Sequence, residues 1–151
     1  MRRLLSMSFR HIFLVCAACI ALAACSSAPP SPPKTSLYER LGGLPAITAV
    51  IDKTIDKAST DPRTSRSFKD VKLKNLKESL TLHLCHIAGG PCKYDGPNMA
   101  KAHSGLAITS AEFDAMAGMV AETLDQFKVP AAEKNELMGV LAAMKPEVVG
   151  K

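Results

Sequence analysis

Two patterns that would point to common classes of protein are missing from this sequence of 151 residues. No stretch alternates polar and apolar residues over a useful length, as half-buried β-strands do, so the sequence favours an all-α domain. A dense cluster of lysine and arginine is missing as well. The stretch that comes closest, residues 69–77, alternates its lysines with apolar residues and is typical of a solvated helix start. We therefore expect no nucleic-acid partner.

Residues 1–24 resemble a secretory signal peptide. Three arginines give the segment a basic start, and the apolar stretch that follows is too short for a membrane-spanning helix with proper flanks. The stretch ends in the letters LAAC, which resemble the lipobox of bacterial lipoproteins. That resemblance implies cleavage before Cys25 and acylation of its thiol and of the new amino group. The alternative is an ordinary signal peptide with a chance cysteine at this place.

The residue after Cys25 is serine rather than aspartate, which favours the outer membrane of a bacterial cell envelope, with the domain facing the periplasm. Several acyl chains hold a domain on a bilayer, whereas one chain binds only marginally. Residues 25–36 contain four prolines, which neither pack into a core nor sustain a helix. We interpret them as a tether between the lipid and one globular domain, residues 37–151.

The domain contains segments with apolar residues at helical spacing, separated by glycine and proline breaks. One of them places Ile47, Val50 and Ile55 on the same face. Thr109 and Glu112 form the capping-box pattern that opens another helix. We expect a short helix before the Gly42-Gly43 break and longer helices over about 45–58, 72–88, 109–127 and 131–149, the last with a kink near Pro146.

His103 lies in a poorly helical segment, residues 98–109, between two of the expected helices. An imidazole is a good axial ligand for haem iron, and the apolar helix faces are suited to form a slot for haem. A histidine with a purely structural role is the common alternative. The residues alone leave both interpretations open.

Five motifs occur in order along the domain: LYERLGGLPAI (37–47), DPRTSRSF (61–68), GGPCKYDGPNM (89–99), AHSGLAITSAEF (102–113) and KVPAAEKNEL (128–137). Their order resembles that of the group I truncated haemoglobins. The resemblance extends over nearly all of residues 37–149 without gaps and implies a truncated globin fold, a two-over-two helical sandwich around haem b. It also implies that His103 is the proximal iron ligand, that Phe68 packs on the haem and that Met99 contacts it.

The distal side of the implied pocket departs from the family pattern. The position at which many members carry a tyrosine that hydrogen-bonds oxygen falls on Ile55, and positions that often carry glutamine fall on Leu76 and Leu80. Each lost hydrogen bond removes about 1–3 kcal/mol, and about 1.4 kcal/mol is a tenfold change. We therefore expect oxygen to leave much faster than from a polar pocket, whereas NO and CO depend less on a donor.

One histidine on the same helix offers a substitute for the missing polar groups. At 100° per residue, His83 projects within about 20° of Leu76, so it is either a distal polar group or iron ligand, or a core or partly exposed histidine. His86 projects away and is expected at the surface. Met116 is expected to line the pocket as a gap filler rather than a second ligand, and Tyr94 to close the loop in which it lies.

Cys85 and Cys92 are the two cysteines that remain beyond the signal peptide and the acylated residue. They bracket a Gly-Gly turn, and a chain that reverses there brings two Cα atoms to about 5–6 Å. In an oxidising compartment this favours a Cys85–Cys92 disulfide, which contributes about 2–3 kcal/mol by loop closure. Two buried thiols, or a metal or redox pair, are the alternatives.

Two classes of function stay open. The first is a haem protein that binds O2, NO or CO; an NO dioxygenase or peroxidase-like side activity is left undecided, because no residue identifies the reductase that dioxygenation needs. The second is a globin-shaped envelope interaction module that has lost haem or keeps it for structure alone. The presence of His103 and Phe68 favours the first class, and the apolar distal side favours the second.

Overall fold

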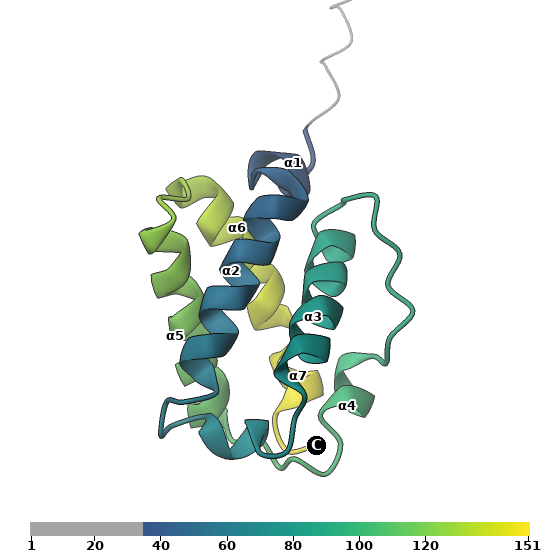
Figure 1. Cartoon of the computed structure of the whole chain (residues 1–151), viewed down its shortest axis with the longest axis vertical. Coiled ribbons are helices and arrows are strands. Elements are labelled where there is room, and N and C mark those ends of the chain that lie inside the picture. Colours follow the sequence, from purple (N-terminus) through teal and green to yellow (C-terminus); the bar gives the residue numbers. More distant parts are fainter. Residues whose placement is uncertain (1–34) are drawn as a thin grey trace, which may run out of the picture. The chain divides into compact units, whose positions relative to one another are not determined.

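The computed structural model describes residues 35–151. The predicted signal peptide, the acylation site at Cys25 and the tether up to residue 34 lie outside the described residues. Within the described part every regular element is helical, and none of the helices is both long and apolar enough to cross a membrane. In chain order the elements are α1 (Leu37–Arg40), α2 (Gly43–Ala58), η1 (Ser65–Phe68), α3 (Leu73–Ile87), α4 (Met99–Ala102), α5 (Ser110–Gln126), α6 (Ala131–Ala143) and α7 (Lys145–Val148) (Figure 1).

Polar caps set the starts of two helices. The Ser36 hydroxyl accepts a hydrogen bond from the Glu39 N–H, while the Glu39 carboxylate accepts one from the Ser36 N–H, and this capping box opens α1. Thr109 and Glu112 make the same reciprocal pair at the start of α5. The capping box predicted for that helix is therefore confirmed, and it fixes where the loop after α4 ends.

The C-terminal helix differs from the prediction. The spacing predicts one kinked helix over 131–149, whereas the structure ends α6 at Ala143 and begins a separate helical turn, α7, at Lys145. Pro146 explains the break, because it has no N–H to donate and its ring clashes with the carbonyl of Ala142, four residues earlier. The short elements η1 and α4 were not predicted, because neither is long enough to show an apolar period.

The four long helices form two layers. α2 packs against α3 and also against α5, and α5 packs against α6. Figure 1 shows α6 lying behind α2. The apolar cluster between the layers comprises Leu37, Ile47, Val50, Leu84, Cys85, Ala88, Leu124 and Leu137. The predicted all-α, two-over-two truncated globin fold is confirmed.

The end of α3 is a crowded turn that is tied to α1. The Tyr38 N–H donates to the carbonyl oxygen of Ala88 at 2.8 Å. The structure pairs Cys85 with Cys92 in the predicted disulfide, with Cα atoms 5.8 Å apart. A Cβ on Gly90 would lie 2.5 Å from the Tyr38 ring and 2.7 Å from the Cys85 sulfur, so only glycine fits there. The disulfide attaches the loop that contains Cys92 to the end of α3.

Candidate functional site

A cavity of about 500 Å³ lies between the helices, a size typical of cofactor pockets. Its walls come from α2, η1, α3, α4, α5, α6 and α7, and most of the side chains that line it are apolar. The structure brings together the seven residues for which the sequence predicted a place around haem, and also His83, for which it left a distal role open. They are Ile55, Phe68, Leu76, Leu80, His83, Met99, His103 and Met116.

His103 directly follows α4 and forms part of the cavity wall. The side chain of Asn98 caps this short helix by accepting a hydrogen bond from the Lys101 N–H at 2.9 Å. The Nδ1 of His103 lies 2.8 Å from the carbonyl oxygen of Met99. Because a carbonyl only accepts, Nδ1 carries the proton of the neutral imidazole and the free lone pair is on Nε2. This nitrogen has no hydrogen-bond partner among residues 35–151 and is free to coordinate a metal.

The distal positions lie on α2 and α3. Ile55 is 1% exposed, and Leu76 and Leu80 are half-buried on the cavity wall. All three side chains are hydrocarbon and offer no hydrogen-bond donor. A molecule held between these residues would meet an apolar surface.

Three other residues on the cavity wall have buried polar atoms that lack a partner in the described chain. These atoms are Thr54 Oγ1, Ser67 Oγ and both ring nitrogens of His83. Thr48 and Thr123 donate to the carbonyl four residues earlier in their helices, but Thr54 makes no such bond. An unpartnered buried polar atom costs about 1–3 kcal/mol, which marks these residues as the polar part of the site. Sequence reasoning missed Thr54 and Ser67, because a hydroxyl residue in a helix or turn carries no distinguishing pattern.

His83 and His86 lie on the same helix in different surroundings. His86 is exposed, as predicted. Burial lowers the pKa of His83 below its usual range, and the neighbouring His86 lowers it further, so the surroundings favour the neutral ring. Tyr94 also lines the cavity, and its hydroxyl donates to the Pro97 carbonyl at 2.9 Å, so it closes its loop as predicted.

The cavity wall also includes apolar side chains that are open to solvent. Val71 and Leu106 are 39% and 37% exposed, and both line the cavity. A flat apolar group bound in the cavity would cover such side chains and gain hydrophobic stabilisation. Haem fits this combination of apolar walls, apolar rim and a histidine with a free Nε2.

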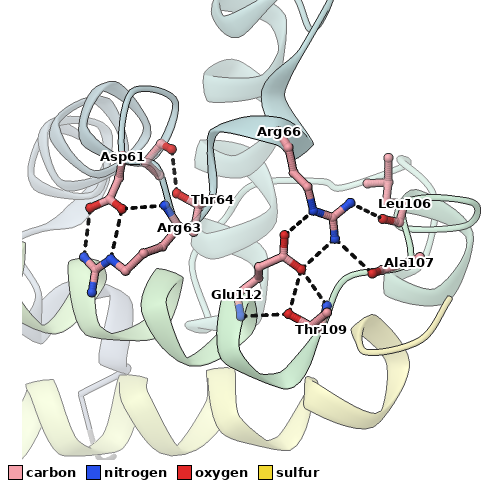
Figure 2. A network of polar contacts seen from close by, with 9 residues as sticks. Asp61, Arg63, Thr64, Arg66, Leu106, Ala107, Thr109 and Glu112 are labelled. Carbon is pink, nitrogen blue, oxygen red and sulfur yellow. Dashed lines mark hydrogen bonds and ion pairs between the residues drawn. The ribbon is translucent and has the colours of Figure 1, made fainter.

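Arg66 lies in η1, the element that carries Phe68 on the cavity wall, and it joins η1 to the segment after α4 (Figure 2). Its guanidinium forms a two-pronged ion pair with Glu112 and donates to the carbonyl oxygens of Leu106 and Ala107, each at 3.0 Å. The Arg66 hydrogen bond, followed by that of the Thr109 N–H, lowers the pKa of Glu112 to about 2. Arg66 and Glu112 are 46 residues apart, and no sequence pattern indicates their contact.

A two-over-two helical fold that surrounds an apolar cavity with a properly oriented histidine defines a globin-type haem protein. The sequence matches the bacterial-like globin family over residues 36–149, and the chain belongs to that family.

Several truncated hemoglobins are similar to this chain. The group 1 truncated hemoglobin of Tetrahymena pyriformis is 33% identical over 116 residues, which are 77% of this chain and 96% of that protein. The group 1 truncated hemoglobin GlbN of Mycolicibacterium paratuberculosis is 30% identical over 113 residues, 75% of this chain and 83% of that protein.

Two solved structures show the same fold. The Tetrahymena pyriformis truncated hemoglobin in its Fe(III) form has a TM-score of 0.74 at 32% identity and covers 78% of this chain and 100% of its own. A 2/2 hemoglobin from Synechococcus, solved in the cyanomet state with covalently attached heme, has a TM-score of 0.68 at 27% identity. The match covers 72% of this chain and 91% of that one.

Proposed function

We propose that this protein is a haem-binding truncated globin that binds diatomic gases, with His103 as the proximal iron ligand. The observation that carries the proposal is the hydrogen bond between His103 Nδ1 and the Met99 carbonyl at the wall of an apolar cavity. Such a bond orients the ring, fixes its tautomer and makes Nε2 a stronger ligand. Membership of the bacterial-like globin family and the similarity to truncated hemoglobins support haem b as the cofactor.

When bound, haem supplies an iron with a coordination position for O2, NO or CO. The chain holds the iron through His103 and surrounds the ring with apolar side chains, among them Phe68, Met99 and Met116. Apolar area removed from water contributes about 25 cal/mol per Å², so these contacts hold the cofactor and exclude water from it.

The distal wall supports rapid release of oxygen. Ile55, Leu76 and Leu80 offer no donor to the partial negative charge that oxygen acquires when it binds. NO and CO depend less on a donor, and we propose that this pocket favours them relative to the polar pockets of other family members. An NO dioxygenase reaction would in addition require electrons from a reductase, which these residues do not identify.

His83 is the side chain proposed to restore some polarity on this side. Burial lowers its pKa and so favours the neutral ring, which lines the cavity, and neither nitrogen has a partner in the described chain. A half-turn of the ring about the Cβ–Cγ bond exchanges each nitrogen with a carbon and leaves the ring's shape unchanged. The orientation is therefore set by whatever polar group the cavity contains, such as a bound gas or a water molecule.

We also propose that the domain is anchored at the envelope membrane through Cys25. Support comes from the lipobox-like end of the first 24 residues and the proline-rich stretch after it. Mass spectrometry of the protein from the membrane fraction should find an N-terminal peptide that begins at Cys25 and carries the mass of acyl chains. Cys25→Ser should remove that mass and release the protein from the membrane. An unmodified N-terminus at any other residue would contradict the anchor and leave haem binding unaffected.

Absorption spectra of the full chain, solubilised in detergent and supplied with haem, test the gas-binding proposal. We expect a stable Soret band that shifts when CO is added to the ferrous protein. His103→Ala should lose this band, and His86→Ala, which replaces an exposed histidine on α3, is the matched control that should keep it. Unchanged spectra in His103→Ala would show that the ligand assignment is wrong. A wild-type chain without a haem band would favour the envelope interaction module instead.

A further inference from the structure

We propose that Arg66 is a positioning residue for the proximal side of the pocket, because it holds the segment between His103 and α5 in place. The inference rests on the proposed haem function of His103. Arg66 acts through the backbone of the segment rather than through contact with the iron or the gas. Its role is to keep the proximal imidazole in a fixed orientation relative to the corner that carries Phe68.

Arg66 spans the gap between η1 and this segment with all three of its nitrogens (Figure 2). Nη1 donates to Leu106 and Nη2 to Ala107, both at 3.0 Å, while Nε and Nη2 together bind the Glu112 carboxylate. A guanidinium is a rigid planar fork, so these contacts fix orientation as well as distance. The Glu112 side chain is 13% exposed and the Arg66 side chain 54%, so the carboxylate is shielded on one side while the guanidinium stays in contact with water.

One residue of the segment, Ala107, has a backbone conformation that its side chain does not favour. Ala107 has a φ of +46°, in the left-handed region that residues with a Cβ rarely adopt, and Gly105 has a φ of +80°. The Ala107 N–H donates to the carbonyl oxygen of Lys151 at 2.8 Å, and its own carbonyl accepts from Arg66. Contacts from outside the segment therefore maintain its path four residues after His103.

The hydrogen bonds from Arg66 to the Leu106 and Ala107 carbonyls also link two walls of the cavity. On the η1 side, Phe68 lines the cavity two residues after Arg66. On the other side, Leu106 and Ile108 line it close to His103. Without the Arg66 side chain, η1 and the segment after His103 are no longer connected. We then expect the orientation of the proximal imidazole to vary.

Arg63 provides a matched control on the same stretch of chain. It binds Asp61 through Nε and Nη2 at 2.9 and 2.8 Å, so it resembles Arg66 in forming a two-pronged ion pair (Figure 2). Its partner lies two residues away, and the pair crosses no gap between elements. Arg63→Ala thus removes an equal side chain and charge without disturbing the proximal segment.

The iron–histidine stretching band of the ferrous haem-loaded full chain, measured by resonance Raman spectroscopy, reports the orientation of the proximal imidazole. Arg66→Ala is expected to shift or broaden this band and to speed haem transfer to excess apomyoglobin about tenfold, the lower end of the usual effect of removing a group that orients a metal ligand. Arg63→Ala should change neither. Arg66→Lys keeps the positive charge but not the planar guanidinium. Its band and haem-loss rate should therefore return at most part of the way to the wild-type values.

Circular dichroism shows whether each variant folds. If Arg66→Ala does not fold, Glu112→Gln takes its place and should likewise shift or broaden the band relative to wild type. A band and haem-loss rate in Arg66→Ala equal to those in Arg63→Ala would overturn the inference while haem binding stands, as would a lower melting temperature with an unchanged band. A wild-type chain that takes up no haem would overturn the proposed function, and this inference with it.

Discussion

The rings of His83 and Tyr94 lie in contact, with centroids 4.6 Å apart and planes tilted by 60°. Tyr94 is itself held in place, because its hydroxyl donates to the Pro97 carbonyl and a Cβ on Gly96 would lie 2.5 Å from its ring. The disulfide attaches the same loop to α3 at Cys92. The loop therefore covers His83 and keeps its ring beside the cavity, where an aromatic contact of this kind adds stability.

This arrangement predicts a measurable contribution of His83 to gas binding. A hydrogen bond from its neutral ring to bound oxygen would contribute about 1–1.5 kcal/mol, so His83→Leu should speed oxygen release about five- to tenfold. Stopped-flow displacement of oxygen by CO measures this rate. His86→Leu, an exposed change on the same helix, should leave it unchanged. If the resting ferric protein is low-spin and becomes high-spin in His83→Leu, the residue is an iron ligand and the hydrogen-bond prediction is wrong.

The apolar distal wall predicts that a single added donor slows oxygen release. Leu80→Gln places an amide on the cavity wall at a position where other family members often carry one, and a new hydrogen bond of about 1–3 kcal/mol slows release at least about fivefold. Leu80→Met changes the shape without adding a donor and is the control. Equal release rates in the two variants would show that this position does not face the bound gas.

How much of this site could be predicted from the sequence depends on which physical rule placed each residue. Ile55, Leu76 and Leu80 lie on long helices with a regular apolar period, so their faces could be assigned without a structure. His103 required the family resemblance, because a lone histidine in a loop has no period to place it. Its hydrogen bond to Met99 depends on the short helix α4, which was too brief to be predicted.

The link between Arg66 and Glu112 lay beyond sequence reasoning for a different reason. The two residues come from elements 46 residues apart, and the accompanying bond from Arg66 goes to the carbonyl of Ala107, whose left-handed backbone an alanine does not predict as a glycine would. The unpartnered hydroxyl of Thr54 was missed in a similar way, because the choice between bonding to its own helix and remaining free is made by packing. Long-range polar contacts of this kind follow from the fold rather than from local pattern.

The disulfide predicts a stability that depends on redox conditions. Replacing both Cys85 and Cys92 with alanine should lower the free energy of unfolding by about 2–3 kcal/mol, because a short loop is no longer closed in the unfolded chain. A reductant should lower the melting temperature of the wild type but not that of the variant. Peptide mapping after alkylation of the unfolded, unreduced protein distinguishes the bond from two buried thiols. Free labelling of both cysteines under those conditions would contradict the disulfide.

The lowered pKa of Glu112 predicts how acid weakens the proximal clamp formed by this residue and Arg66. A carboxylate whose pKa is about 2 in the folded protein and about 4.3 in the unfolded chain stabilises the fold fully above the unfolded value. That contribution disappears as the pH falls through the folded value. Glu112→Gln lacks it at every pH, so the difference in unfolding free energy between wild type and variant should shrink as the pH falls from about 5 to about 2.

Urea unfolding followed by circular dichroism at several pH values measures this difference, and any loss of haem in acid that the two proteins share cancels in it. The Arg66 hydrogen bond is the largest cause of the lowered pKa, so in Arg66→Ala the pKa of Glu112 should rise toward its ordinary value. The part of the unfolding free energy that Glu112 contributes should then be smaller, and it should be lost at a higher pH. A difference between wild type and Glu112→Gln that stays constant between pH 5 and pH 2 would show that the carboxylate is not held by Arg66 in solution.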